Sequence, residues 1–128
     1  MNPLPTSGRP PRRFPHAVYR VGQEPDPRFS LANERTFLAW IRTSLALLAA
    51  GVALESLSLP LQPDLRLAAS LLLVVLGLLA PVQAWLGWAR DERAMREGRP
   101  LAAPLLTAPL AAGCVVTAVL VLAGLVLR

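Results

Sequence analysis

The sequence predicts an all-α integral membrane protein, a bundle of three transmembrane helices with a disordered N-terminal tail and a short interfacial helix. Composition is the first reason: 54% of the 128 residues are hydrophobic and 16% are charged, whereas soluble domains carry about 25% charged residues. The second is that residues 67–89 and 101–127 contain no charge, and each run exceeds the roughly 18 apolar residues expected of a span. The third is residues 37–59, an apolar stretch with only two charges.

Residues 1–25 are expected to form a disordered basic tail. This segment contains six prolines, two glycines and four arginines, and it shows neither a helical nor a strand period. Such a composition offers little apolar surface for packing. Arg12 and Arg13 could suggest a twin-arginine signal peptide, whose apolar core would begin soon after them. Pro15 and His16 stand at that point instead, so a cleaved signal peptide is not expected. The membrane domain is therefore expected to comprise residues 26–128.

The first span is expected to follow a short interfacial helix. Asp26 is a favoured N-cap, and Pro27 suits the first position of a helix. Residues 28–36 mix apolar and charged side chains, which favours a position in the headgroup layer. The span itself is predicted at about residues 37–59, because roughly 20 residues at about 1.5 Å each cross a core of about 30 Å.

The second span is predicted at about residues 67–89 and the third at about residues 103–127. Pro81 is expected to kink the second helix. Pro104 and Pro109 are expected in the first turns of the third helix, where a missing backbone donor costs least.

Past its apolar part, the second helix is expected to project beyond the bilayer. Glu92 and Arg96 are spaced four residues apart, as are Arg93 and Glu97, and such pairs favour a solvated helix. Gly98 then provides a helix-stop signal.

Arginine counts predict the orientation. Six arginines lie in the first 36 residues and four in the second loop, whereas the first loop and the C-terminal tail hold one each. Basic residues favour the cytoplasmic side. Trp40, Trp85 and Trp88 fall near the same expected interface. We therefore expect a multi-pass protein of the plasma (inner) membrane, with a cytoplasmic N-terminus and an extracytoplasmic C-terminus.

Small residues recur along one face of each predicted span, and such faces allow close helix packing within the chain or between copies. A ligand groove is the alternative. The candidate packing residues are Ala46, Ala49, Ala53, Ser70, Gly77, Ala84, Gly113 and Thr117.

A motif in the first helix resembles that of a known family. The stretch from Asn33 to Ala46, read with Asp26, Arg28 and Leu31 before it and Gly51 after it, is similar to the signature of the YidH-like family, domain of unknown function 202. Members of this family are small inner-membrane proteins with three spans. The family also resembles the membrane domain of the yeast vacuolar transporter chaperone complex, whose three-helix units assemble into a polyphosphate channel. That resemblance implies that Arg35 and Arg42 contact a polyanion.

The arginines themselves leave several interpretations open. Arg35 and Arg42 lie seven residues apart on one helical stripe, and a guanidinium can donate two hydrogen bonds to a phosphate. They could anchor the helix against anionic lipid, pair with Glu34 or Asp91, or recognise an anion. Arg90 is a third candidate at the same end.

The expected function is that of a non-enzymatic membrane subunit that forms oligomers or serves another membrane protein. The alternative is a homo-oligomeric conduit or binding site for an anion such as polyphosphate or anionic lipid headgroups. An enzyme is not expected, because the acidic residues form no pair spaced for general acid and base work. One cysteine, Cys114, and one histidine, His16, exclude an internal disulfide and predict no metal site or cofactor. The arginines flank apolar runs, so no nucleic-acid partner is expected.

Overall fold

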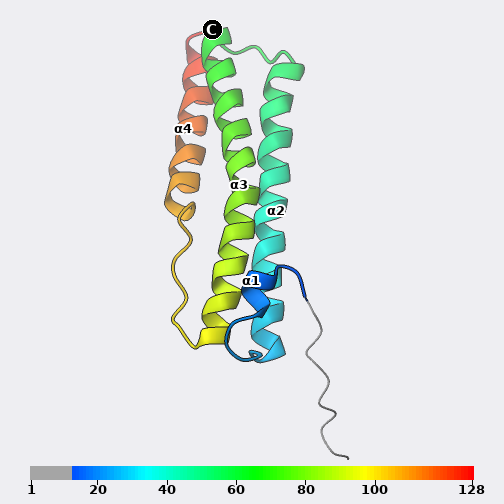
Figure 1. The fold of residues 1–128 in the computed structure, drawn as a ribbon. Coiled ribbons are helices and arrows are strands. Elements are labelled where there is room, and N and C mark those ends of the chain that lie inside the picture. Colours follow the sequence, from blue (N-terminus) through cyan, green and yellow to red (C-terminus); the bar gives the residue numbers. More distant parts are fainter. Residues whose placement is uncertain (1–12) are drawn as a thin grey trace, which may run out of the picture.

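The computed structural model describes residues 13–128, and within them the chain is entirely helical apart from turns and connecting segments (Figure 1). A single-turn helix, α1 (His16–Tyr19), is followed by α2 (Pro27–Ser56), α3 (Pro63–Glu97) and α4 (Thr107–Val126). The last three are long and apolar enough to cross a membrane. The predicted all-α fold with three spans is confirmed.

Helix α2 is one continuous helix of 30 residues, so the expected interfacial helix is its first part and not a separate element. Asp26 caps it as predicted, with Oδ1 accepting from the Arg28 backbone N at 2.9 Å. Its first turns stay in line with the rest because Ser30 and Asn33 donate hydrogen bonds to α3. The helix ends at Ser56 rather than near residue 59.

Helix α3 has 35 residues and extends well past its uncharged part, as predicted. The Gln62 side chain caps its start by accepting from the Leu65 backbone N at 2.8 Å. Pro81 lies inside the helix. Gly98 ends it in the left-handed conformation, with φ of +69°, which glycine adopts without strain.

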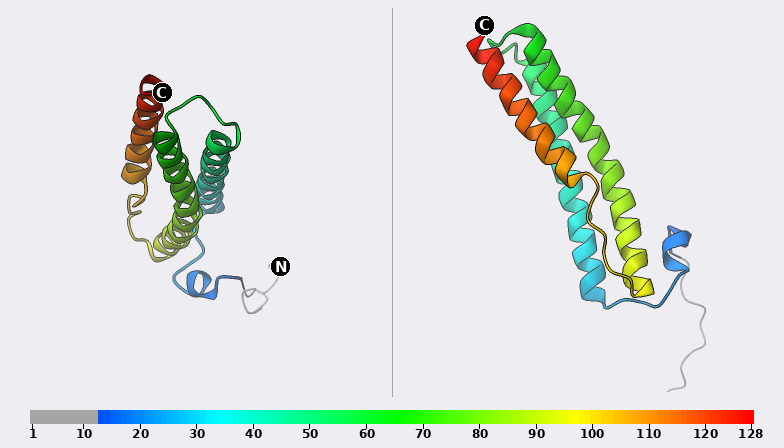
Figure 2. Two further views of the ribbon diagram at one scale, coloured as in Figure 1. Left: turned by 90° about the horizontal axis from the view of Figure 1, so that it is seen from above. Right: turned by 90° about the vertical axis from the view of Figure 1, so that its left-hand side faces the viewer.

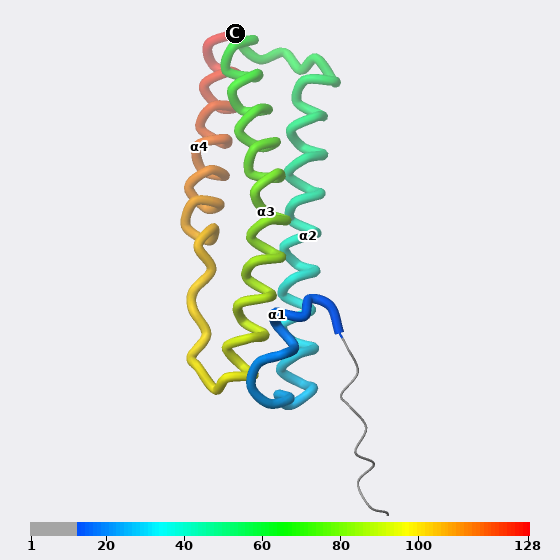
Figure 3. The backbone as a smooth tube through the Cα atoms, in the orientation of Figure 1, coloured from blue at the N-terminus to red at the C-terminus, as the bar shows by residue number. Residues whose placement is uncertain are grey.

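Helix α4 begins at Thr107, so Pro109 lies in its first turn and Pro104 lies outside it. The span expected from residue 103 is therefore shorter at its start. Proline disfavours the helical conformation in the residue before it, so Pro104 keeps Ala103 out of the helix. Figure 3 shows the resulting connection running from the end of α3 to the start of α4.

Helix α3 lies between α2 and α4, and in the described part of the chain α2 and α4 each pack on α3 and not on each other (Figure 2). The α2–α3 pair is antiparallel with a constant register. Four contacts along the pair join residues whose numbers sum to 121: Asn33 with Trp88, Ser44 with Gly77, Gly51 with Ser70, and Glu55 with Arg66.

The α2–α3 hairpin extends beyond α4 at one end. Gly113 packs beside Leu76 and Gly124 beside Leu65, which places Thr107 near the level of Val82. The 20 residues of α4 rise about 30 Å, the thickness of a hydrocarbon core. The remaining 15 residues of α3, at about 1.5 Å each, project roughly 20 Å further. We call this projecting end of the α2–α3 hairpin the basic end.

Residues 13–25, the later part of the segment expected to form the tail, include α1. Helix α1 packs on α3 at the basic end. The cause is Arg96, which is 8% exposed and binds backbone carbonyls of this segment. Residues 1–12, the rest of the expected tail, lie outside the described residues.

Candidate functional site

Two serine hydroxyls join α2 to α3 in a reciprocal arrangement. Ser44 Oγ donates to the Gly77 carbonyl at 2.6 Å, and Ser70 Oγ donates to the Gly51 carbonyl at 2.6 Å. All four residues are buried. A hydroxyl that donates a hydrogen bond to the neighbouring helix has a partner where water is absent. The bond also fixes the register of the two helices.

The glycines of this seam permit the close approach. A Cβ on Gly51 would lie 2.9 Å from the Ser70 carbonyl oxygen, and one on Gly77 would lie 2.8 Å from Leu48 Cγ. The candidate packing residues Ser70 and Gly77 therefore pack within the chain, and Ala84 on the same stripe is also buried.

The α3–α4 contact uses two further candidate packing residues, Gly113 and Thr117. Gly113 is buried against Leu76, whose Cδ1 would lie 2.5 Å from an added Cβ. Thr117 is buried too, but its hydroxyl donates to the Gly113 carbonyl of its own helix at 2.8 Å. The α3–α4 contact at this level therefore depends on how closely glycine fits against leucine.

The alanines of α2 lie elsewhere. Ala46 and Ala49 are exposed and Ala53 is half-buried. At about 100° per residue they point away from Ser44 and Gly51, the residues that face α3. Their side of α2 is unoccupied in the described chain.

Arg35 and Arg42 share this outward side and are exposed. Neither makes an ion pair or side-chain hydrogen bond with any of residues 13–128. Pairing of Arg42 with Glu34 or Asp91, one of the interpretations that the sequence left open, is therefore not formed. Arg90 differs, because it is half-buried and its Nη2 lies 3.5 Å from the Ala103 carbonyl in the segment before α4. The three candidate arginines, expected at the same end of the protein, therefore lie in two separate places. We call Arg35, Ala39, Arg42, Ala46 and Ala49, all exposed, the outward face of α2.

A buried acidic residue lies at the basic end. Glu92 is 4% exposed and accepts from Ser30 Oγ at 2.8 Å and from Asn33 Nδ2 at 3.3 Å. Asn33 also donates to the Trp88 carbonyl at 3.0 Å. The sequence reasoning missed this link because it paired Glu92 with Arg96 along the same helix.

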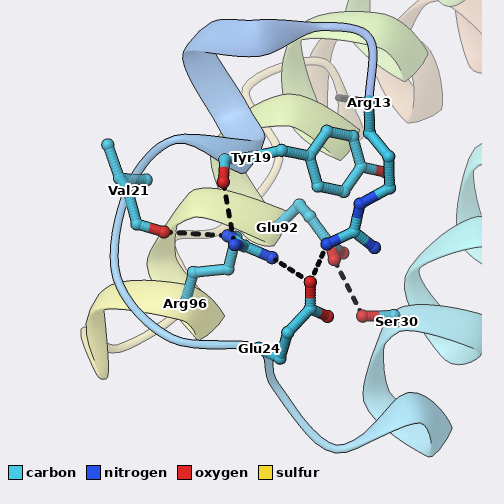
Figure 4. Close-up of polar contacts among 7 residues, drawn as sticks. All are labelled: Arg13, Tyr19, Val21, Glu24, Ser30, Glu92 and Arg96. Atoms are coloured by element: carbon cyan, nitrogen blue, oxygen red, sulfur yellow. Dashed lines mark hydrogen bonds and ion pairs between the residues drawn. The ribbon is translucent and has the colours of Figure 1, made fainter. Parts of the chain in front are cut away.

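Arg96 turns instead to the N-terminal segment (Figure 4). Its Nε donates to the Val21 carbonyl at 2.8 Å, its Nη2 donates to the Tyr19 carbonyl at 2.9 Å, and its Nη1 lies 3.3 Å from Glu24 Oε1. Arg13 also pairs with Glu24. The other expected pair, Arg93 with Glu97, is present at 3.7 Å.

The groove between α2 and α4 is largely apolar. Its volume is about 540 Å³, and it is bordered by Ala39, Trp40 and Thr43 on one side and by Leu110 and Cys114 on the other. No cluster of histidine, cysteine or acidic side chains suited to a metal occurs among residues 13–128.

Comparisons with known proteins place this geometry in a family. Residues 28–94, which contain the α2–α3 seam and Glu92, match the family described as Domain of unknown function (DUF202). The Inner membrane protein YidH of Escherichia coli (strain K12) is 50% identical over 80 residues, which cover 62% of this chain and 70% of that protein. The Uncharacterized protein Rv2272 of Mycobacterium tuberculosis (strain H37Rv) is 45% identical over 106 residues, or 82% and 87% of the two chains. No solved structure matches. With its three membrane-spanning helices and these relatives, the chain is a multi-pass inner-membrane protein that belongs to the YidH-like DUF202 family.

Proposed function

We propose that this protein is a non-enzymatic membrane subunit that associates with a second copy of itself through the outward face of α2. One observation carries the proposal: Ala46 and Ala49 are exposed on the side of α2 opposite α3, whereas the candidate packing residues of α3, Ser70, Gly77 and Ala84, are buried. Small side chains let helices approach closely inside a bilayer, where van der Waals packing drives association.

The absence of catalytic activity is part of the proposal. The groove between α2 and α4 is lined by apolar side chains, threonine hydroxyls and Cys114. No basic or acidic side chain of the described residues borders it to activate a nucleophile. A subunit role needs no such group.

Crosslinking in native membranes tests the association. Leucine at both Ala46 and Ala49 adds bulk to the outward face, so we expect at least a tenfold loss of crosslinked dimer. The matched control places leucine at Ala112 and Ala118, which are exposed on α4, and should leave the dimer intact. Equal amounts of dimer in both variants would remove the proposed interface.

A second candidate function, binding of an anion such as polyphosphate or a lipid phosphate, is favoured by the depth of Arg42. The register places Ala39 near the level of Thr107, so Arg42 lies about 4–5 Å inside the level at which α4 begins. A charge within the hydrocarbon is costly and normally has a partner. Arg35 lies about 10 Å away along the same side.

Paired substitutions test this candidate. Replacing Arg35 and Arg42 by Gln should weaken binding of polyphosphate or anionic lipid to the purified protein tenfold or more. Replacement by Lys should weaken it less, since the charge remains while the bidentate fork is lost. Wild-type binding by the Gln variant would reduce both residues to anchors.

We also propose that the basic end faces the cytoplasm, because ten arginines flank that side of the three spans and two flank the other. A phosphatase reporter fused after Arg128 should then be active, and one inserted after Glu97 should be inactive. The reverse pattern would invert the topology.

A further inference from the structure

A cavity at the basic end lies between α1 and the α2–α3 hairpin. Its volume is about 300 Å³, at the lower end of the range of about 300–1,000 Å³ for small-molecule sites. Four aromatic and two acidic side chains supply most of its walls, namely Tyr19, Phe37, Trp85, Trp88, Glu34 and Glu92. Among residues 13–128, none that lines the cavity is basic.

The absence of basic residues from this cavity is informative because arginines crowd the same end of the molecule. Those arginines have other partners: Arg96 and Arg13 bind Glu24, Arg28 binds Asp26, and Arg93 binds Glu97. Two of these arginines nevertheless lie against one wall residue, because the guanidinium carbons of Arg13 and Arg96 are 4.3 and 5.4 Å from the centroid of the Tyr19 ring. The aromatic surface left for a ligand is therefore that of Trp85, Trp88 and Phe37.

The two carboxylates of the cavity are not neutralised by an ion pair among residues 13–128. Glu92 is buried, and within the described part of the chain its hydrogen bonds come only from the neutral groups of Ser30 and Asn33. Glu34 is exposed at the rim and makes no side-chain hydrogen bond in the described chain. Burial of a carboxylate is costly unless a positive charge lies close by, so this cavity favours a cation.

The aromatic walls specify what kind of cation fits. Trp85 and Trp88 lie with ring centroids 5.5 Å apart, and Tyr19 meets Trp88 edge-on at 6.3 Å. Aromatic faces attract ammonium groups that carry apolar carbon substituents, and such walls recognise choline-like ligands. A small inorganic cation instead needs several oxygen ligands, which these rings do not provide.

The depth of the cavity matches a lipid headgroup. Its residues on α2 and α3 lie beyond Ala39 and Val82, the levels at which α4 begins. If α4 marks the hydrocarbon core, this position is the interfacial layer, where tryptophans also concentrate.

We propose that this cavity binds an organic ammonium group, with Glu92 and Glu34 supplying the negative charge and Trp85, Trp88 and Phe37 supplying the aromatic walls. The ammonium is carried either by an ethanolamine-type lipid headgroup or by a soluble amine such as choline. This site lies on a different side of α2 from the outward face and does not depend on it.

Tryptophan fluorescence of the full-length protein in nanodiscs tests the proposal, because Trp85 and Trp88 border the cavity. In nanodiscs of phosphatidylglycerol alone, saturable quenching or enhancement by choline or ethanolamine, absent with sodium chloride, supports a soluble ligand. A spectral change produced by including phosphatidylethanolamine, without a response to soluble amine, supports the lipid headgroup. No response in either arm overturns the proposal.

Variants assign the response to the cavity. Glu34→Gln removes a rim charge without removing a described hydrogen bond, so it should weaken binding at least tenfold. Phe37→Leu should weaken it severalfold while leaving all three tryptophans in place. The matched control is Glu97→Gln, which removes a carboxylate at the same end but outside the cavity and should bind as wild type does. If Glu34→Gln and Phe37→Leu also bind as wild type does, the cavity is not the site.

Discussion

Helix α3 holds its two neighbours in different ways. Its contact with α2 contains the hydrogen bonds of Ser44 and Ser70. At the end of the hairpin opposite the basic end, Arg66 Nε also lies 3.3 Å from Glu55 Oε1. Its contact with α4 relies on glycine against leucine, with one backbone bond from Gln62 N to the Gly124 carbonyl at 2.9 Å. No side-chain hydrogen bond joins α3 to α4 among residues 13–128.

This difference indicates which helix contact fixes the register of the fold. Directional bonds permit a single register, because a shift of one residue would leave buried hydroxyls and carbonyls without partners. An apolar contact tolerates small shifts, since leucine side chains repack and lipid replaces lost contacts. We therefore expect the α2–α3 hairpin to be the stable unit and α4 to be the element that adjusts.

The largest effect should come from Gly51→Leu. The new side chain would meet the Ser70 carbonyl, a backbone atom that cannot move without separating the two helices. We expect a loss of about 3 kcal/mol in the free energy of unfolding, at the upper end of overpacking effects. Unfolding by a denaturing detergent, followed by tryptophan fluorescence, measures it.

A smaller effect is expected from Gly113→Leu in the α3–α4 contact. Here the new side chain meets the end of the Leu76 side chain, which can rotate, and α4 can shift outward. We expect about 1–2 kcal/mol in the same assay. A loss equal to that of Gly51→Leu would contradict the view that α4 adjusts more easily.

The hydroxyl bonds themselves are tested by replacing Ser44 and Ser70 together with Ala. Interhelical hydrogen bonds in membrane proteins contribute about 0.6 kcal/mol each on average, so the pair should account for about 1 kcal/mol. The control is Thr117→Ala, whose bond lies within its own helix and should matter less. Equal losses would show that the seam is held by shape alone.

The smallest effect concerns a contact that belongs to neither seam. Hydrogen bonds from the Arg28 side chain and then its backbone N lower the pKa of Asp26 below its ordinary value. Because the pKa is lower in the folded state, this stabilisation is present above the ordinary value of 3.8 and is lost as the pH falls through the folded pKa. Asp26→Asn keeps an N-cap but cannot titrate. Its stability difference from wild type should therefore shrink in acid, and a constant difference would contradict the expected linkage.

The sequence predicted which candidate residues share one face of a helix, but it did not predict which side of the molecule that face occupies. Spacing showed that Arg35 and Arg42 share a stripe with Ala46 and Ala49, and the structure places that stripe opposite α3. Spacing also treated all small residues alike, whereas Ser70 is covered by α2 and Ala49 is exposed. Helical periodicity defines a face without saying which neighbour occupies it.

The sequence by itself determined the three spans, the start of α2 at Asp26 and the end of α3 at Gly98, because hydrophobic length and capping chemistry are properties of a local segment. Only the tertiary structure decided the partners of the charged residues at the basic end. Glu92 binds Ser30 and Asn33 of α2, and Arg96 binds the N-terminal segment. These two side chains do not pair with each other, although they are spaced four residues apart on one helix. A buried polar group takes the donors that surround it, and those donors come from segments that spacing within one helix does not identify.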